Sequence, residues 1–183
     1  DEYLDVLSLL LFSACGIGVL ISASSLLMVF LGLEFMSLPV YALVGCRRHS
    51  AASCEAALKY FLFGAFASVL LLLGIAILYA GSGSLYFPVV ERYLQGAARL
   101  PVSVSAGLMI AVVGFKLGVA PFHLWLPDTY EGAPTPITGF MGSAVKLAGL
   151  ALALRLFWGP LLPAVGHWSP VVITLSIAAM VVG

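Results

Sequence analysis

Long apolar stretches separated by short polar ones run through this whole sequence and restrict the architectures it can adopt. A helix that crosses a bilayer needs about 20 mostly apolar residues, and the chain offers about six such stretches. Only 9% of its residues are charged, against about 25% in soluble domains. We therefore predict an all-α, polytopic membrane helical bundle. Residues 1–183 would form a single, partial transmembrane domain.

The predicted spans follow one another along the chain with short connections. The longest polar stretch, residues 81–101, is expected to be a strand-like or irregular loop outside the bilayer. Arg47, Arg48 and His49 lie in a short loop, and the positive-inside rule favours that side as cytoplasmic. Because the chain starts without a methionine and ends inside an apolar run, we expect it to be a piece of a longer protein. The spans cover about residues 3–21, 26–45, 54–79, 102–120, 136–158 and 171 onward.

Other function classes find no support in the sequence. The net charge is zero, so nothing indicates nucleic-acid binding. The three cysteines lack the spacing of metal ligands and are interpreted as small apolar residues. We find no metal site, no phosphate-binding glycine loop and no pairing of a nucleophile with a base. The sequence therefore predicts no chemical active site.

A proline-rich segment interrupts the apolar pattern after residue 120. Pro121 lacks a backbone N–H and clashes with the preceding helical turn, so we expect the fourth span to break there. Residues 122–130 would form a short second piece, and residues 121–135 a helix break and hinge. Broken transmembrane helices expose free backbone groups, which line ion paths in transporters.

Four ionisable residues lie inside apolar spans, where they should be rare. Glu34, Lys116 and Lys146 are well inside their spans, and Lys59 lies about a turn and a half inside its helix. A charged residue at the centre of a span costs roughly 2.5–3.5 kcal/mol on insertion scales. One acid cannot neutralise three bases, so at least one lysine must be hydrated or lose its proton. These residues are candidates for a proton relay.

Structural roles remain open for each of them. Lys59 could reach the interface beside Glu55, four residues earlier. Glu34 could form a structural ion pair with one lysine. Lys116 and Lys146 have glycines nearby and could simply hold helices together.

The hinge carries three further polar candidates. His123 follows the break and could relay protons, because histidine titrates near neutral pH. A hydrogen-bonded structural role is equally compatible with its position. Asp128 and Glu131 are expected to cap the next helix or to solvate the loop.

Three motifs resemble one known family. They are L-G-L-E-F-M-S-L-P (residues 31–39), E-A-A-L-K-Y (residues 55–60), and F-K-L-G-V-A-P-F-H-L-W-L-P-D-T-Y-E-G-A-P-T-P-I-T-G-F (residues 115–140). In this order the motifs resemble the antiporter-like membrane subunits of respiratory complex I, the NADH–quinone oxidoreductase. Among these they look most like subunit N, the counterpart of mitochondrial subunit 2.

The resemblance implies a role for the buried charges. Glu34 would pair electrostatically with Lys116 on the broken helix, and Lys146 would pass the proton onward. Lys59 matches a less firmly assigned lysine. The family fold has about fourteen helices with two inverted five-helix repeats, of which this chain would supply the fourth to ninth.

The resemblance also implies partners and location. The chain would bind no cofactor, while quinone, NADH, FMN and iron–sulfur clusters would belong to partner subunits. Its own partners would be other membrane-arm subunits, the lipid bilayer and protons, with no nucleic acid. We expect a bacterial inner membrane, with an organellar inner membrane as the alternative. A subunit of a multisubunit cation/proton antiporter and a purely structural membrane-arm subunit remain alternative functions.

Overall fold

The computed structural model describes residues 2–182 and confirms the all-α prediction. No β-strand occurs in that range, apart from one isolated bridge between Ser25 and Tyr86. Two shorter helical turns adjoin α8 and α9: a π-helical turn at Met141–Val145 and a 3-10 turn at Leu162–Ala164. The α-helices are α1 (Glu2–Ser22), α2 (Leu26–Val44), α3 (Ala51–Ser82), α4 (Phe87–Leu94), α5 (Arg99–Leu117), α6 (Leu126–Gly132), α7 (Thr135–Phe140), α8 (Lys146–Phe157) and α9 (Val165–Val182).

Six helical segments of the described chain are long and apolar enough to cross a membrane. This number matches the sequence prediction. Four of the spans are α1, α2, α3 and α5, the fifth combines α7, the π-helical turn and α8, and the sixth contains α9. The chain is therefore a polytopic membrane bundle.

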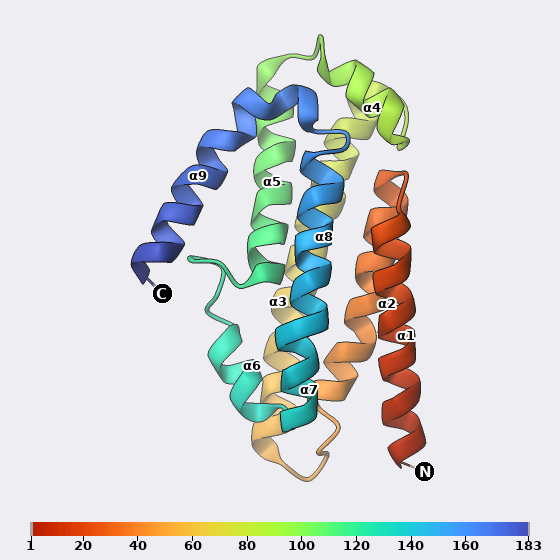
Figure 1. Ribbon diagram of the computed structural model, residues 1–183, viewed down its shortest axis with the longest axis vertical. Coiled ribbons are helices and arrows are strands. Elements are labelled where there is room, and N and C mark those ends of the chain that lie inside the picture. The colour runs from red at the N-terminus through yellow and green to blue at the C-terminus, as the bar shows by residue number, and fades with distance from the viewer. Residues whose placement is uncertain (1, 183) are drawn as a thin grey trace.

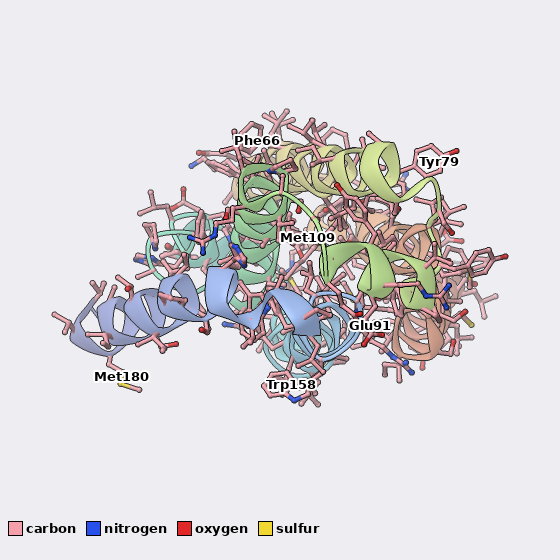
Figure 2. The ribbon with its side chains drawn as sticks, turned by 90° about the horizontal axis from the view of Figure 1, so that it is seen from above. Phe66, Tyr79, Glu91, Met109, Trp158 and Met180 are labelled. Carbon is pink, nitrogen blue, oxygen red and sulfur yellow. The ribbon has the colours of Figure 1, made fainter. Side chains whose placement is uncertain are left out.

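The spans stand side by side, with α4 at one end of the bundle and α6 at the other (Figure 1). Helix α1 packs on α2, α3 packs between α2 and α5, and α5 also contacts α8 and α9. Viewed along the helices, Met109 of α5 lies inside the bundle, whereas Phe66 of α3 and Met180 of α9 lie at its rim (Figure 2). A membrane protein can expose such apolar side chains because lipid surrounds them.

The contact between α1 and α2 depends on small and polar residues. A Cβ atom at Gly16 would overlap the backbone of Met36, and one at Gly32 would overlap the backbone of Leu20. Ser13 is fully buried, and its hydroxyl donates to the Met36 carbonyl at 3.0 Å. Close backbone approach and interhelical hydrogen bonds are how helices associate in a bilayer, so these residues bring α1 against α2.

Residues 81–101 are more ordered than the sequence analysis predicted. Helix α3 continues to Ser82, α5 starts at Arg99, and α4 forms between them. The expectation of a strand-like or irregular loop is therefore wrong. Val90 and Leu94, four residues apart, are both buried on one face of α4, and Pro88 lies in its first turn, where a missing N–H costs little.

Helix α3 is also longer than the predicted span over residues 54–79. It begins at Ala51 because Ser50 caps it: the Ser50 hydroxyl accepts from the Ser53 N–H at 3.3 Å. At the other end Gly83 adopts a left-handed conformation with φ 68°. A serine at the start and a glycine just past the end are common helix boundaries.

Candidate functional site

Lys116 lies in the last turn of α5 and is almost completely buried, with 2% of its surface exposed. Its ammonium group donates to the Ser37 hydroxyl of α2 at 2.8 Å. The faces of two aromatic rings lie nearby, with centroids 5.7 Å (Tyr41) and 5.6 Å (Phe115) from Nζ. Over residues 2–182 no carboxylate lies within ion-pair distance of Lys116. A buried cation is thus held by one hydroxyl and two rings.

Gly118 fixes the position of Lys116 by ending the helix. It has φ 69°, a left-handed conformation that glycine adopts without steric cost. The Gly118 N–H donates to the Phe115 carbonyl at 3.1 Å, and the Val119 N–H donates to the Gly114 carbonyl at 2.9 Å. This pattern is a Schellman motif, and it places Lys116 in the final turn of α5.

The helix break differs in detail from its prediction. Helix α5 ends at Leu117, three residues before the predicted end at residue 120, and Pro121 lies within the following connection. The second helical piece is α6, Leu126–Gly132, rather than residues 122–130. Proline marks the interrupted segment, but the left-handed glycine determines where the helix stops.

Glu34 lies on α2, three residues before Ser37, and accepts a short hydrogen bond from the Ser68 hydroxyl of α3. The resemblance implied that Glu34 pairs with Lys116. In this structure each of the two is bound to a serine hydroxyl instead, Glu34 to Ser68 and Lys116 to Ser37. Residues three apart are neighbours on a helix face. Glu34 therefore lies one turn along α2 from the hydroxyl that holds Lys116.

Lys146 reaches the same end of α5 from α8. Its ammonium group donates to the Leu117 carbonyl at 2.9 Å. A Cβ atom at Gly118 would lie 3.3 Å from Lys146 Nζ, and one at Gly149 would lie 3.4 Å from the Cβ of Lys116. The carbonyls at a helix C-terminus attract cations, so the end of α5 binds Lys146 directly beside Lys116.

Lys59 is separate from this group. Its ammonium group forms ion pairs with Glu55 at 2.7 Å and with Asp128 at 2.6 Å. The ion pair with Glu55 agrees with the structural role left open for Lys59, in which this lysine lies beside Glu55. Asp128 was expected to cap a helix or to solvate the loop, and instead it joins α6 to α3. A pocket of about 160 Å³ lies here, and Glu131 is one of its lining residues.

His123 lies in the connection between α5 and α6 and is half-buried. Its Nδ1 atom is buried and has no hydrogen-bond partner in the described part of the chain. No described hydrogen bond joins His123 to Lys116 or Lys146. The structure thus brings together Glu34, Lys116 and Lys146 around α2 and the end of α5, and leaves Lys59 and His123 outside that group.

The hydroxyl and aromatic partners of the buried charges did not stand out in the sequence. Ser37, Ser68 and Tyr41 all contribute to the site, and Tyr60 supports it by stacking on Trp125 with centroids 4.6 Å apart. A helical spacing could have found two of them, because Ser37 and Tyr41 follow Glu34 by three and seven residues on one face of α2.

Two further features of the described residues lie outside this group. Residues 2–182 contain no group of three or more histidine, cysteine, aspartate or glutamate residues that could hold a metal ion. A larger groove of about 740 Å³ lies at the ends of α1 and α2, where Asp5, Arg47 and His49 are among its lining residues. Neither Lys116 nor Lys146 is among its lining residues.

Residues 23–183 match the profile of a protein family described as NADH:quinone oxidoreductase/Mrp antiporter, transmembrane. The chain belongs to this family. It is accordingly an integral membrane protein, and its bacterial relatives favour a bacterial inner membrane over an organellar one.

Similar curated proteins are named NADH-quinone oxidoreductase subunit N, which confirms the resemblance seen in the sequence. The protein from Laribacter hongkongensis is 44% identical over 181 residues, which are 98% of this chain and 37% of the relative. The protein from Herminiimonas arsenicoxydans is 46% identical over 94% of this chain and 35% of the relative. The chain thus spans little more than a third of the length of these relatives.

Two solved structures share the fold. Respiratory complex I from Thermus thermophilus with bound aureothin contains a chain with 40% identity and a TM-score of 0.73, over 82% of this chain and 34% of that one. The membrane-bound sulfane sulfur reductase, an archaeal respiratory membrane complex, contains a chain with 28% identity and a TM-score of 0.81, over 93% of this chain and 34% of that one.

Proposed function

We propose that this chain is part of a proton-translocating, antiporter-like subunit N of a NADH–quinone oxidoreductase. Lys116 would bind and release the proton, Glu34 would control its charge, and Lys146 would pass the proton onward. The proposal rests on the names of the similar proteins and on the chemistry of the buried charges described above.

The observation that carries the proposal is a lysine that is 2% exposed and has no carboxylate at ion-pair distance in the described chain. Burying a cation without a counter-ion is costly, and ionisable residues of this kind inside membranes mark ion or proton paths. Inside a membrane, such a lysine is held without the counter-ion that would fix it in the charged form. A proton carrier needs an ionisable group that is not locked in an ion pair.

The arrangement also provides a next group for the proton. Lys116 and Leu117 are consecutive residues, and Lys146 is bound to the Leu117 carbonyl. Two ammonium groups at the end of one helix repel each other, so a change in the charge of one changes the energy of the other. This coupling supports Lys146 as the neighbouring group of Lys116 in the relay.

Cofactors and partners follow from the proposed subunit. The chain would bind no cofactor, and NADH, FMN, iron–sulfur clusters and quinone would be handled by partner subunits of the complex. Other membrane-arm subunits would cover the exposed faces of the spans, which carry many apolar side chains. The work of this subunit would be coupled to quinone reduction elsewhere, without redox chemistry of its own.

An alternative is a subunit of a multisubunit cation/proton antiporter, since the family description includes both groups. The same lysines would then exchange protons against cations without NADH. Sodium-dependent proton movement in membranes that lack a NADH–quinone oxidoreductase would favour this function.

Lys116→Ala in the full-length subunit of the assembled complex tests the proposal. We expect proton pumping and coupled quinone reduction to fall together by at least tenfold, while NADH oxidation by an artificial electron acceptor is retained. Arg92→Ala, on the exposed side of α4, is the control and should keep full activity. Normal pumping per assembled complex in Lys116→Ala would show that Lys116 has only a structural role.

A further inference from the structure

Tyr41 is a buried polar residue that the proposed relay does not use. It is 6% exposed, and its hydroxyl has no hydrogen-bond partner among residues 2–182. The hydroxyl lies against α3 at Gly64, where any Cβ atom would overlap it. Tyr60 and Phe61 of α3 contact the ring edge to face, with centroids 4.7 and 5.8 Å away. The ring is therefore held firmly in one place.

The ring of Tyr41 faces the ammonium group of Lys116, with 5.7 Å between Nζ and the ring centroid. A cation within about 6 Å of an aromatic face is attracted by the electrons of the ring, and more strongly where water is excluded. Phe115 also contacts the ammonium group, but it precedes Lys116 on α5 and moves with it. Tyr41 is the ring that ties Lys116 to α2.

Three successive turns of α2 present different groups to Lys116. Glu34 comes first, Ser37 follows after three residues and Tyr41 after four more, which places them on one face. Lys116 is bound to the middle group, Ser37. The carboxylate that would attract it lies one turn to one side, and the aromatic ring lies one turn to the other.

We propose that Tyr41 is a positioning residue that holds Lys116 on Ser37 and away from Glu34. The ring stabilises the ammonium group in its unpaired position, where the attraction of Glu34 would otherwise draw it into an ion pair. Tyr41 thereby shifts the equilibrium of Lys116 from the ion pair with Glu34 towards the hydrogen bond with Ser37. This inference rests on the proposed function, in which the pairing of Lys116 controls its proton.

The first test is structural and uses the assembled complex with the full-length subunit. In Tyr41→Leu, which removes the ring, we expect electron cryomicroscopy to show Lys116 Nζ within 4 Å of the Glu34 carboxylate. In Tyr41→Phe, which keeps the ring, Lys116 should remain on Ser37. If Lys116 stays on Ser37 in Tyr41→Leu, the inference is wrong. Tyr41→Met fills the space with a flexible side chain and replaces Tyr41→Leu if the latter does not assemble.

The second test measures coupled quinone reduction per assembled complex. We expect at least a threefold loss in Tyr41→Leu and a change of less than twofold in Tyr41→Phe. Phe35→Leu, an exposed aromatic residue of the same helix, is the matched control and should keep its activity. Equal losses in Tyr41→Leu and Phe35→Leu would indicate a general packing effect and overturn the inference.

Lys116→Ala, measured alongside, separates the two proposals. If Lys116→Ala pumps normally, the proposed function fails. If Lys116→Ala abolishes pumping while Tyr41→Leu has no effect, the proposed function stands and only the role of Tyr41 is refuted.

Discussion

Gly118→Ala should destabilise the end of α5 by an amount that the backbone geometry predicts. Gly118 has φ 69°, and a residue with a Cβ atom pays about 1–2 kcal/mol in the left-handed helical region. The new Cβ would also overlap the end of the Leu126 side chain and lie 3.3 Å from Lys146 Nζ. We therefore expect a loss of about 1–2 kcal/mol in the free energy of unfolding, plus a smaller term for moving Leu126.

Equilibrium unfolding of the full-length subunit in mixed micelles is a suitable assay, with Gly107→Ala as the matched control. Gly107 lies inside the same helix, and a Cβ there would meet nothing within 4 Å. Alanine is a better helix former than glycine by roughly 0.5–1 kcal/mol, so Gly107→Ala should be neutral or stabilising. In a double-mutant cycle of Gly118→Ala and Leu126→Ala, the coupling should equal the smaller term only. Equal stability of Gly118→Ala and Gly107→Ala would refute the argument from the left-handed turn.

Two other predictions concern contacts of α3. The first is a double-mutant cycle of Lys59→Ala and Asp128→Ala, measured by the same unfolding assay. Because both side chains are partly exposed (40% and 53%), their coupling energy should be about 0.2–1 kcal/mol. A coupling energy above about 2 kcal/mol would contradict this expectation. Gly64→Ala should cost about 1–3 kcal/mol by overpacking, since its Cβ would overlap the Tyr41 hydroxyl. In the Tyr41→Leu background Gly64→Ala should cost much less than in the wild type, and an equal cost in both backgrounds would show that the two residues are not in contact.

The bilayer made the spans predictable. Each crossing needs about 20 apolar residues, and a stretch of that length is easily recognised in the sequence. The same cost made Lys116 and Lys146 stand out as candidates. Helix α4 gave a weaker signal, since its eight residues include a proline and two charges, and only Val90 and Leu94 mark a buried face.

The partners of the buried charges could not be predicted in the same way. Ser37 precedes Lys116 by 79 residues, and Asp128 follows Lys59 by 69. Serines in apolar helices often bond only to a carbonyl of their own helix, so the sequence does not distinguish a serine that binds a lysine. These contacts depend on how the spans pack, which a single sequence does not specify.

Helix α6 is attached to α3 at both of its ends. Trp125, just before α6, stacks on Tyr60 of α3. Within α6, Asp128 forms an ion pair with Lys59 of α3, and Gly132 lies close to Ala52 of α3. These two helices should therefore move as one body. Trp125 also contacts the last turn of α5, because its indole N–H donates to the Phe115 carbonyl at 3.2 Å. A displacement of α3 would therefore reach the residue next to Lys116 through this direct hydrogen bond.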